Sequence, residues 1–339
     1  MYLYGTVNNR TGWIAAKDLI QSNKDVQARP YNYTFVISNS NSYYYEDLGK
    51  NARYSLKPYY DKTFVVSKQK NINGVTWYYG KLTNGKYVWI KSTDVAKESV
   101  KYVNTGYTLA HAAEIQNDLY DTPQIQKVPG QWTNANYNEI KDAMDPNKLT
   151  KDSGARYQFL RLDQPQSLSV AALNELLKGQ GVLEGQGAAF SEAAKKYGIN
   201  EIYLVAHALV ETGNGTSQLA KGGDIVNGKF SDKTKTKYHN VFGIGAYDSS
   251  PLIEGIKYAK NAGWDSVSKA IIGGAKFIGQ SYIKAGQNTL YKMRWNPSNP
   301  GTHQYATDIH WATVNAQTIK GFYDKIGEVG KYYEIPKYK

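Results

Sequence analysis

The feature that most constrains the fold is an apolar stretch at residues 202–215 with the sequence Ile-Tyr-Leu-Val-Ala-His-Ala-Leu-Val-Glu-Thr-Gly-Asn-Gly. From Ile202 to Leu209 its apolar residues recur at helical spacing, so the pattern predicts a buried helix. Gly213 is expected to end that helix, because glycine readily adopts the left-handed conformation of a helix C-cap. The last charged residue before this end is Glu211, so the helix would present a carboxyl group at its C-terminus.

A carboxyl group in this position is suited to acid catalysis. Apolar or small residues surround Glu211 in the sequence, and apolar surroundings disfavour the charged form of a carboxyl group. The partial negative charge of a helix C-terminus acts in the same direction. We therefore expect Glu211 to hold a proton that it can donate to a leaving group. A solvated glutamate that merely ends a helix would show the same pattern.

Length and composition bound the class of protein. A chain of 339 residues exceeds one ordinary hydrophobic core and predicts two or three domains. A hydrophobic content of 41% and a charged content of 21% are those of a folded chain. Cysteine is absent, which excludes disulfide bonds, thiolate metal ligands and a cysteine nucleophile. Because no apolar run reaches about eighteen residues, we expect no membrane span.

Positive charge is concentrated in the N-terminal third. Residues 1–105 carry 15 lysines and arginines against 7 acidic residues, which is +8 of the net charge of +12. Such a region suits a polyanionic partner. The chain also has 30 tyrosines against 8 phenylalanines, a bias typical of carbohydrate-binding β-modules, because the ring stacks on sugar while the hydroxyl stays hydrated.

An internal repeat organises this basic region. Trp13 and Asp18 recur as Trp89 and Asp94, at a constant offset of 76 residues. Short β-rich runs separated by turn residues, such as Asn-Gly at positions 73 and 74, predict a small all-β barrel with the tryptophan rings in its core. The first copy is incomplete and no signal peptide opens the chain, so we expect a segment of a longer polypeptide.

This repeat resembles the GW modules of Gram-positive cell-wall proteins, which are SH3-like barrels. The first copy has the Gly12-Trp13 dipeptide, whereas the second has Val88-Trp89. On this resemblance, residues 1–22 are the end of a truncated module and residues 23–100 are a complete one. The resemblance implies that residues 1–100 bind lipoteichoic or wall teichoic acid.

The chain changes character after the module. Residues 101–130 are expected to be a linker, because prolines break any longer element there. Residues 131–339 show helical patterns with N-caps and terminal glycines, and predict a mainly α domain. A polar stretch at 223–239 and an aromatic run at 291–308 interrupt these helices. Loops of this kind on a helical body commonly form a saccharide groove.

Most other chemistries lack a sequence signal. His207 and Glu211 lie four residues apart on one helix face, but no His-Glu-x-x-His motif occurs among the five histidines, so we expect no metal. A nucleophilic-serine motif, a phosphate-binding loop and a dinucleotide fingerprint are also absent, so we expect no cofactor. Carboxylate chemistry remains, with Asp224, Asp232 or Asp248 as a partner for Glu211.

Three blocks resemble glycoside hydrolase family 73. They are Ala-Leu-Val-Glu-Thr-Gly-Asn-Gly-Thr-Ser at 208–217, Asn-Val-Phe-Gly-Ile at 240–244 and Gln-Tyr-Ala-Thr-Asp at 304–308. The match covers about residues 130–339. It implies a lysozyme-like α-rich fold and cleavage of the β-1,4 bond after N-acetylglucosamine in the glycan strands of peptidoglycan.

The resemblance also implies roles for single residues. Glu211 matches the general acid, and Asp248 and Tyr305 match further active-site positions. Substrate contacts are expected from the three blocks and from the aromatic run, at Thr212, Asn240, Phe242, Gly243, Tyr291, Trp295, Gln304 and Thr307. The second catalytic group is not fixed by the motifs: Asp232 and Asp224 are candidates, and the N-acetyl oxygen of the substrate is an alternative.

Together these features predict a secreted, monomeric peptidoglycan hydrolase that stays on the Gram-positive cell wall. A wall-bound adhesion protein that only binds glycan is the alternative of a different class, and muramidase or lytic transglycosylase activity is the alternative within the same class. Nucleic-acid binding is not expected, because the basic residues of the module are scattered among Tyr and Asn without forming a cluster.

Overall fold

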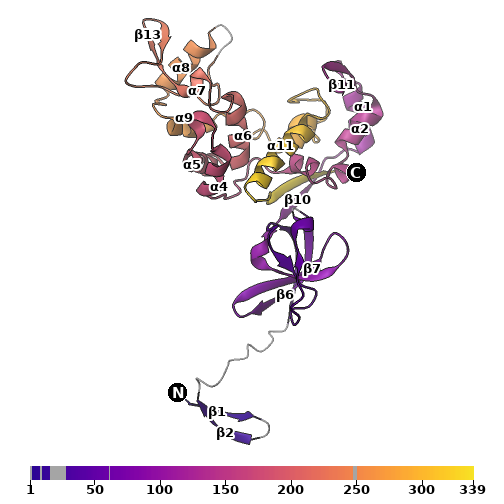
Figure 1. Ribbon diagram of the computed structural model, residues 1–339. Coiled ribbons are helices and arrows are strands. Elements are labelled where there is room, and N and C mark those ends of the chain that lie inside the picture. Colours follow the sequence, from indigo (N-terminus) through magenta and orange to yellow (C-terminus); the bar gives the residue numbers. More distant parts are fainter. Residues whose placement is uncertain (1, 8–9, 16–27, 61, 247–249) are drawn as a thin grey trace. The chain divides into compact units, whose positions relative to one another are not determined.

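The computed structural model describes residues 2–7, 10–15, 28–60, 62–246 and 250–339, with the backbone alone for residues 2–15. The chain divides into two compact units, Met1–Ala96 and Lys97–Lys339 (Figure 1). The first unit is all-β and SH3-like and the second is mainly helical, as the sequence predicted.

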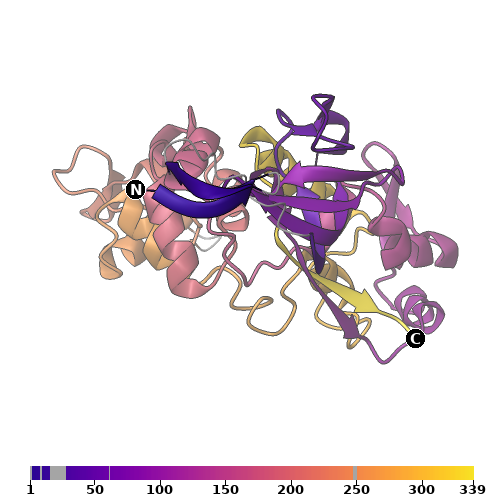
Figure 2. The ribbon, with the colours of Figure 1, turned by 90° about the horizontal axis from the view of Figure 1, so that it is seen from below.

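In the part of the N-terminal unit that the structure describes, the strands form two hairpins and a curled sheet. Strands β1 (Tyr2–Val7) and β2 (Arg10–Ala15) pair antiparallel (Figure 2). A five-stranded sheet has the order β8-β7-β6-β3-β9, formed by Tyr87–Lys91, Val75–Lys81, Thr63–Ile72, Arg29–Ile37 and Val95–Lys97. The short strands β4 (Tyr43–Tyr44) and β5 (Tyr54–Ser55) also pair. Asn73 and Gly74 turn β6 into β7 with φ of 50° and 80°, which confirms the predicted Asn-Gly hairpin.

Alternation along β8 decides which side chains enter the core of this unit. Val88 and Ile90 are fully buried, together with residues such as Phe64 on β6. Trp89 lies between them on the opposite face, where its ring contacts the ring of Tyr79. The prediction that the Trp89 ring packs in the core is therefore wrong. The side chain of Trp13 lies outside the described part of the chain.

The described residues of the second unit form helices and three short strand pairs. Its helices are α1 (Leu109–Asn117), α2 (Tyr137–Met144), α3 (Pro146–Leu149), α4 (Val170–Leu177), α5 (Gly187–Tyr197), α6 (Glu201–Glu211), α7 (Gln218–Lys221), α8 (Pro251–Asn261), α9 (Val267–Ala275), α10 (Leu290–Trp295) and α11 (Trp311–Lys325). The strand pairs are β11 (Gln124–Val128) with β12 (Gln131–Asn134), β13 (Asp224–Val226) with β14 (Lys229–Ser231), and β10 (Ser99–Asn104) with β15 (Tyr332–Lys337). None of the helices formed by the described residues is long and apolar enough to cross a bilayer.

The segment expected to be a linker is instead part of this unit. Strand β10 pairs in parallel with β15, so that Ser99 faces Tyr332 and Asn104 faces Lys337. Helix α1 packs on α2, and the hairpin β11–β12 follows it. The partner of β10 lies more than two hundred residues away in the chain, so local composition carried no sign of this pairing.

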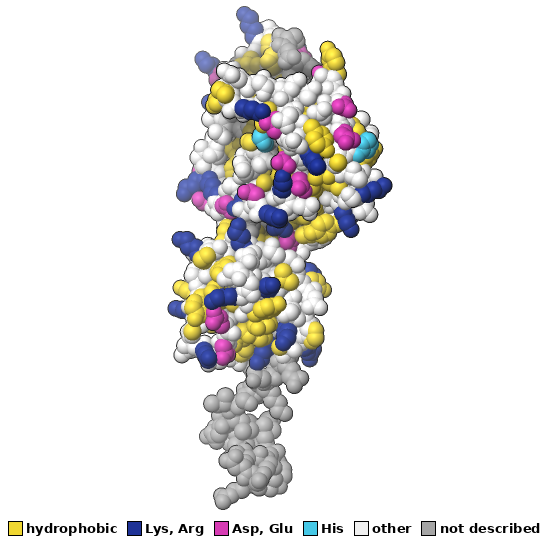
Figure 3. Space-filling view, turned by 90° about the vertical axis from the view of Figure 1, so that its right-hand side faces the viewer, with side chains coloured by type: hydrophobic (Ala, Val, Ile, Leu, Met, Phe, Trp, Pro, Cys, Tyr) yellow, Lys and Arg dark blue, Asp and Glu magenta, His cyan; other side chains and the backbone are white. Residues whose placement is uncertain are grey.

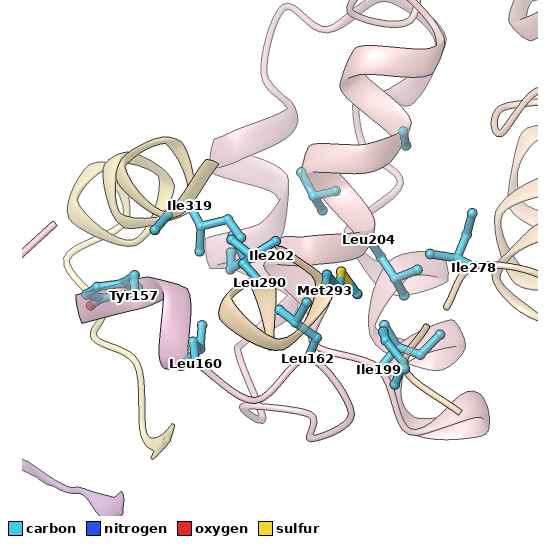
Figure 4. Close-up of a cluster of buried hydrophobic side chains, with 14 of the residues drawn as sticks. Tyr157, Leu160, Leu162, Ile199, Ile202, Leu204, Ile278, Leu290, Met293 and Ile319 are labelled. Carbon is cyan, nitrogen blue, oxygen red and sulfur yellow. The ribbon is translucent and has the colours of Figure 1, made fainter. Parts of the chain in front are cut away.

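The core of the second unit holds its central helices together. Side chains from the 3-10 helix η4 (Ala155–Phe159) and the residue that follows it, from α6, from α10 and from α11 meet in one buried cluster (Figure 4). Ile202 on α6, Leu290 on α10 and Ile319 on α11 are at most 3% exposed. This packing fixes α6 and α11 against each other, and these are the helices that border the candidate site.

Buried polar residues anchor the N-terminus of α6. The carboxylate of Glu201, itself fully buried, accepts hydrogen bonds from the backbone amides of Gln166 (2.7 Å), Ser167 (3.0 Å) and Leu168 (3.4 Å). Asn200 caps the helix by accepting from its third residue, and its amide donates to the hydroxyl of Tyr323 on α11 at 3.1 Å. The helix that carries Glu211 is thus fixed at the end opposite its carboxyl group.

Candidate active site

A cavity of about 440 Å³ lies between α6 and α11. Its lining includes Tyr203, His207 and Glu211 from α6, and Trp311 and Asn315 from α11, with Tyr305 from the preceding loop. A larger cavity of about 610 Å³ lies beside β15 and α3. Its one acidic lining residue, Asp145, already caps α3, so it offers no free acid. The chemistry is therefore assigned to the cavity between α6 and α11.

Helix α6 ends as the sequence predicted, and this end positions Glu211. Gly213, Asn214 and Gly215 all have positive φ, between 54° and 75°. The Thr212 hydroxyl donates to the Ala208 carbonyl oxygen at 2.6 Å and accepts from the Gly215 amide at 2.7 Å. Thr212 is 1% exposed, so its role is to shape the turn. The structure contradicts the expectation that Thr212 contacts substrate.

The carboxyl group of Glu211 faces the cavity and is more exposed than the sequence indicated. Its side chain is 41% exposed, because the helix ends at the rim of the cavity. Gly243 approaches it from the opposite loop: a Cβ at Gly243 would lie 3.3 Å from Oε2 of Glu211. Gly243 also has φ of 65°, which favours glycine. The absence of a side chain at residue 243 therefore leaves the carboxyl group room for a ligand.

The loop that carries Gly243 is held by Asn240. The Asn240 amide donates to the carbonyl oxygens of Ile244 (2.8 Å) and Gly255 (3.2 Å), and its oxygen accepts from the amides of Phe242 and Ile244. Asn240 is 1% exposed and Phe242 is 5% exposed. Their predicted substrate contacts are therefore wrong, because both side chains support the loop from inside.

A column of aromatic rings begins at the wall of the cavity, which Tyr305 and Trp311 line. Tyr305 stacks on Trp311 with ring centroids 4.6 Å apart and contacts Tyr282 at 5.1 Å, and Tyr282 stacks on His303 at 4.6 Å. Tyr305 is 48% exposed. Burial of the ring raises the pKa of Tyr305, and the nearby Glu211 and Tyr282 add to this, so the phenol stays protonated and can donate a hydrogen bond.

Two predicted aromatic contacts do not reach the cavity. Tyr291 and Trp295 belong to α10 and are fully buried, and the Tyr291 hydroxyl donates to the Met144 carbonyl oxygen at 2.6 Å. The expectation that they bind substrate is corrected, because residues 290–295 are helical and face the core. Gln304 and Thr307 border a neighbouring shallow cavity of about 570 Å³ that also includes Tyr305.

The two described candidates for a carboxylate partner, Asp224 and Asp232, lie outside the cavity that Glu211 lines. Asp224 forms an ion pair with Lys260 at 2.8 Å, and the hydrogen bond from Lys260 lowers the pKa of Asp224. Asp232 is exposed on the loop after β14. Neither lines the cavity, and Asp248 lies outside the described residues. Among the described residues that line the cavity, Glu211 is the only carboxylic acid.

His207 lies one turn before Glu211 on the same face of α6. The distance from its Nε2 to Oε1 of Glu211 is 3.8 Å, and its side chain is 26% exposed. The rings of Tyr203 and Phe242 lie on either side, at 6.1 and 6.0 Å. Burial lowers the pKa of His207, and the neighbouring Glu211 only partly opposes this. His207 is therefore expected to be neutral in the folded protein near neutral pH.

This lowered pKa predicts a pH dependence of stability. The unfolded chain takes up a proton at His207 at a higher pH than the folded protein, so the free energy of unfolding falls as the pH drops below the ordinary histidine pKa of about 6.5. When the pH is lowered from about 7.5 to about 5.5, we expect the melting temperature of the His207→Gln variant to fall less than that of the unsubstituted protein. Thermal unfolding across this range measures the difference.

The matched control for this experiment is His111→Gln, because the side chain of His111 is 59% exposed. That variant should follow the pH profile of the unsubstituted protein. Identical profiles for the His207 and His111 variants would contradict a buried, neutral His207.

Comparison with known proteins identifies relatives of this chain. A family model described as mannosyl-glycoprotein endo-beta-N-acetylglucosaminidase matches residues 187–324. The whole chain is 73% identical to a quarter (25%) of the bifunctional autolysin of Staphylococcus epidermidis, and 64% identical to 27% of that of Staphylococcus aureus strain MW2. The chain thus spans about a quarter of the length of the curated relatives that it matches.

Solved structures extend this likeness to the fold. The crystal structure of Major Bifunctional Autolysin matches 72% of this chain and 100% of its own chain, with 66% identity and a TM-score of 0.66. The crystal structure of S. aureus glucosaminidase B matches 72% of this chain and 95% of its own, with 41% identity and a TM-score of 0.64. The chain therefore belongs to the endo-β-N-acetylglucosaminidase family of glycoside hydrolases, as its three motifs predicted, and is homologous to the staphylococcal bifunctional autolysins.

Proposed function

We propose that this chain is a peptidoglycan hydrolase that cleaves the β-1,4 bond after N-acetylglucosamine, with Glu211 as the general acid. The observation that carries the proposal is the position of Glu211: the only carboxylic acid among the described lining residues stands at a helix end, in the same cavity as the stacked rings of Tyr305 and Trp311. Half-exposed aromatic rings are surfaces on which sugar rings stack, and a glycosidic oxygen bound beside them would lie within reach of the acid.

In the proposed reaction Glu211 gives its proton to the glycosidic oxygen as the bond to the anomeric carbon breaks. A saccharide that fills the cavity would cover the exposed carboxyl group and exclude water from it. The protonated phenol of Tyr305 lines the same cavity, so its oxygen would face the developing positive charge of the sugar while its proton is donated to a polar group of the substrate. Gly243, Gln304 and Thr307 remain proposed contacts.

The group that completes the reaction is proposed to be the N-acetyl oxygen of the substrate. This choice is favoured because neither Asp224 nor Asp232 lines the cavity. In such a reaction the N-acetyl oxygen attacks the anomeric carbon, and water then opens the cyclic intermediate with Glu211 as the base. Asp248 stays a candidate from its position in the sequence beside the Asn-Val-Phe-Gly-Ile block.

The N-terminal unit is proposed to hold the enzyme on the cell wall by binding lipoteichoic or wall teichoic acid. Its positive charge supports this, since lysine and arginine side chains lie beside hydrophobic ones on the visible side of that unit (Figure 3). The protein would then be a secreted, wall-associated monomer. Its substrate would be the glycan strands of peptidoglycan.

The test is mass spectrometry of the fragments released from purified peptidoglycan after reduction of their new ends. We expect reduced N-acetylglucosamine at each new end. Reduced N-acetylmuramic acid would overturn the bond assignment in favour of a muramidase, and a 1,6-anhydro end would identify a lytic transglycosylase, which a lone carboxylic acid also permits. Binding to glycan with no release of fragments would favour the adhesion protein.

A further inference from the structure

A second cavity adjoins the one that Glu211 lines. Its volume is about 570 Å³, and it lies between the residues that follow α1, at positions 119–121, and the loop at residues 301–307. We call it the distal cavity. Tyr305 lines both cavities, so a long ligand bound beside Glu211 would meet the distal cavity next.

Backbone contacts hold the two walls of the distal cavity together. The amide of Gln124 donates to the Thr307 carbonyl oxygen at 2.9 Å, and the amide of Ile309 donates to the Gln124 carbonyl oxygen at 2.9 Å. Gly301 has φ of 82° and lies close to Leu119, whose Cδ2 would be 3.1 Å from a Cβ at that glycine. The segment after α1 is therefore fixed to the loop of the active site, and the cavity between them is preformed.

The wall that follows α1 carries an exposed aromatic ring. Tyr120 is 101% exposed, which is the exposure of a residue in an open chain, so its ring contributes nothing to core packing. A single exposed aromatic residue is common on protein surfaces, but this one lines a cavity beside the active site. A tyrosine ring stacks on the C–H face of a sugar while its hydroxyl stays hydrated, so Tyr120 offers a stacking surface.

Polar groups with unused hydrogen-bonding capacity line the same cavity. The amide nitrogen of Gln304 is shielded from solvent and has no hydrogen-bond partner among the described residues. On the other wall, the exposed carboxylate of Asp121 pairs with no cationic side chain in the part of the chain that the structure describes. One wall therefore offers a donor and the other an acceptor, and the hydroxyl and N-acetyl groups of a sugar can use both.

We propose that the distal cavity binds a further sugar unit of the glycan strand, with the Tyr120 ring on its C–H face and with Asp121 and Gln304 as hydrogen-bond partners. The strand would pass over Tyr305 on its way from the cavity that Glu211 lines. This inference rests on the proposed function, because the sugar in the distal cavity belongs to the strand that is cleaved. It gives the segment after α1 a part in selecting long strands over short fragments.

The chemistry of the lining favours a sugar over a cationic group of the peptides attached to the strand. An ammonium group has three donors and no acceptor. It would pair with Asp121 and lie against the Tyr120 ring, but it would leave the amide nitrogen of Gln304 without an acceptor. An N-acetylated sugar supplies acceptors as well as donors, so it satisfies both walls.

Tyr120→Ala tests the distal cavity on peptide-free glycan strands that are fractionated by length. We expect the ratio of kcat/KM for long strands to kcat/KM for the shortest fragments to fall by about 3- to 10-fold, as for the loss of one stacking contact. The matched control is Tyr102→Ala, which removes a 66% exposed tyrosine of β10 outside the distal cavity and should keep the ratio. Thermal unfolding verifies that both variants are folded.

Two results for Tyr120→Ala would overturn the distal site. An unchanged ratio would mean that long strands do not use the ring. An equal loss of kcat/KM on long and short substrates would place the effect in the cavity that Glu211 lines.

Asp121→Asn separates a sugar from a cationic peptide group. The substitution removes the charge and keeps one acceptor oxygen. For a bound sugar, the ratio should fall by the same factor on peptide-free strands and on strands that carry their peptides. A loss confined to the strands with peptides would assign the cavity to the peptide and overturn the choice of a sugar.

A binding measurement keeps this inference separate from the proposed function. Glu211→Gln should bind long peptide-free strands with little cleavage, and the added change Tyr120→Ala should weaken that binding by about 3- to 10-fold in a titration. Equal affinities of the single and double variants would overturn the distal site. Reduced N-acetylmuramic acid at the new ends made by the unsubstituted protein would instead overturn the bond assignment alone, so the two failures are distinguishable.

Discussion

Glu211→Gln is expected to reduce kcat for the release of reducing sugars from purified peptidoglycan by about 10²- to 10⁴-fold. Glutamine has the shape of glutamic acid and no acidic proton, so the leaving sugar would depart as an alkoxide. The variant should fold normally, because Glu211 is partly exposed and its carboxylate lies 3.8 Å from Nε2 of His207, which is neutral near neutral pH. We expect its free energy of unfolding to change by less than about 0.5 kcal/mol.

Steady-state kinetics and thermal unfolding on the same preparation separate catalysis from stability. Glu192→Gln provides the matched control, because it makes the same chemical change on the exposed face of α5 and should leave kcat unchanged. Unchanged turnover in the Glu211 variant would exclude this residue as the general acid. If the variant lost turnover because it no longer folds, the unfolding curve would show the loss of stability.

Glu201→Ala is expected to destabilise the protein by about 3 kcal/mol or more, although Glu201 lies at the end of α6 opposite Glu211. The fully buried carboxylate accepts from three backbone amides of residues 166–168, and alanine leaves these donors without a partner. Each buried, unsatisfied donor costs about 1–3 kcal/mol. Denaturant unfolding measures the loss as a shift of the midpoint.

The control for this prediction is Glu192→Ala, which should change the free energy of unfolding by about 0.5 kcal/mol or less. Glu201→Gln is informative as well, because its amide group keeps one acceptor oxygen and turns a donor toward the same backbone amides. It should fall between the alanine variant and the unsubstituted protein. A loss below about 1 kcal/mol for Glu201→Ala would mean that the amides find other acceptors.

The architecture was predictable where local chemistry determines it. The end of α6 follows from the glycines after Thr212, and the β6–β7 hairpin follows from Asn73 and Gly74. The strand pair β10–β15 was not predictable, because its two members contact each other only in the folded chain. The position of the Trp89 ring was missed because a tryptophan was assumed to be buried, whereas alternation with Val88 and Ile90 places it outside.

The site was predictable to a similar degree. The motifs identified Glu211 and Tyr305, which line one cavity. They also contained Asn240 and Thr212, whose hydrogen bonds show that a motif includes residues that shape the backbone as well as residues that face the ligand. Trp311 and Tyr282 carried no signal, because an aromatic residue at a helix start or in a loop has no characteristic spacing.

The parallel pairing of β10 and β15 has a mechanical consequence for the second unit. The chain enters the unit at the start of β10 and reaches its last residues at the end of β15, and in a parallel pair these two points lie at opposite ends of the ladder. A pull along the chain would therefore load the ladder in shear, with all its hydrogen bonds sharing the force at once. Tension on the chain would have to break the whole ladder before it reached the helices around the cavity.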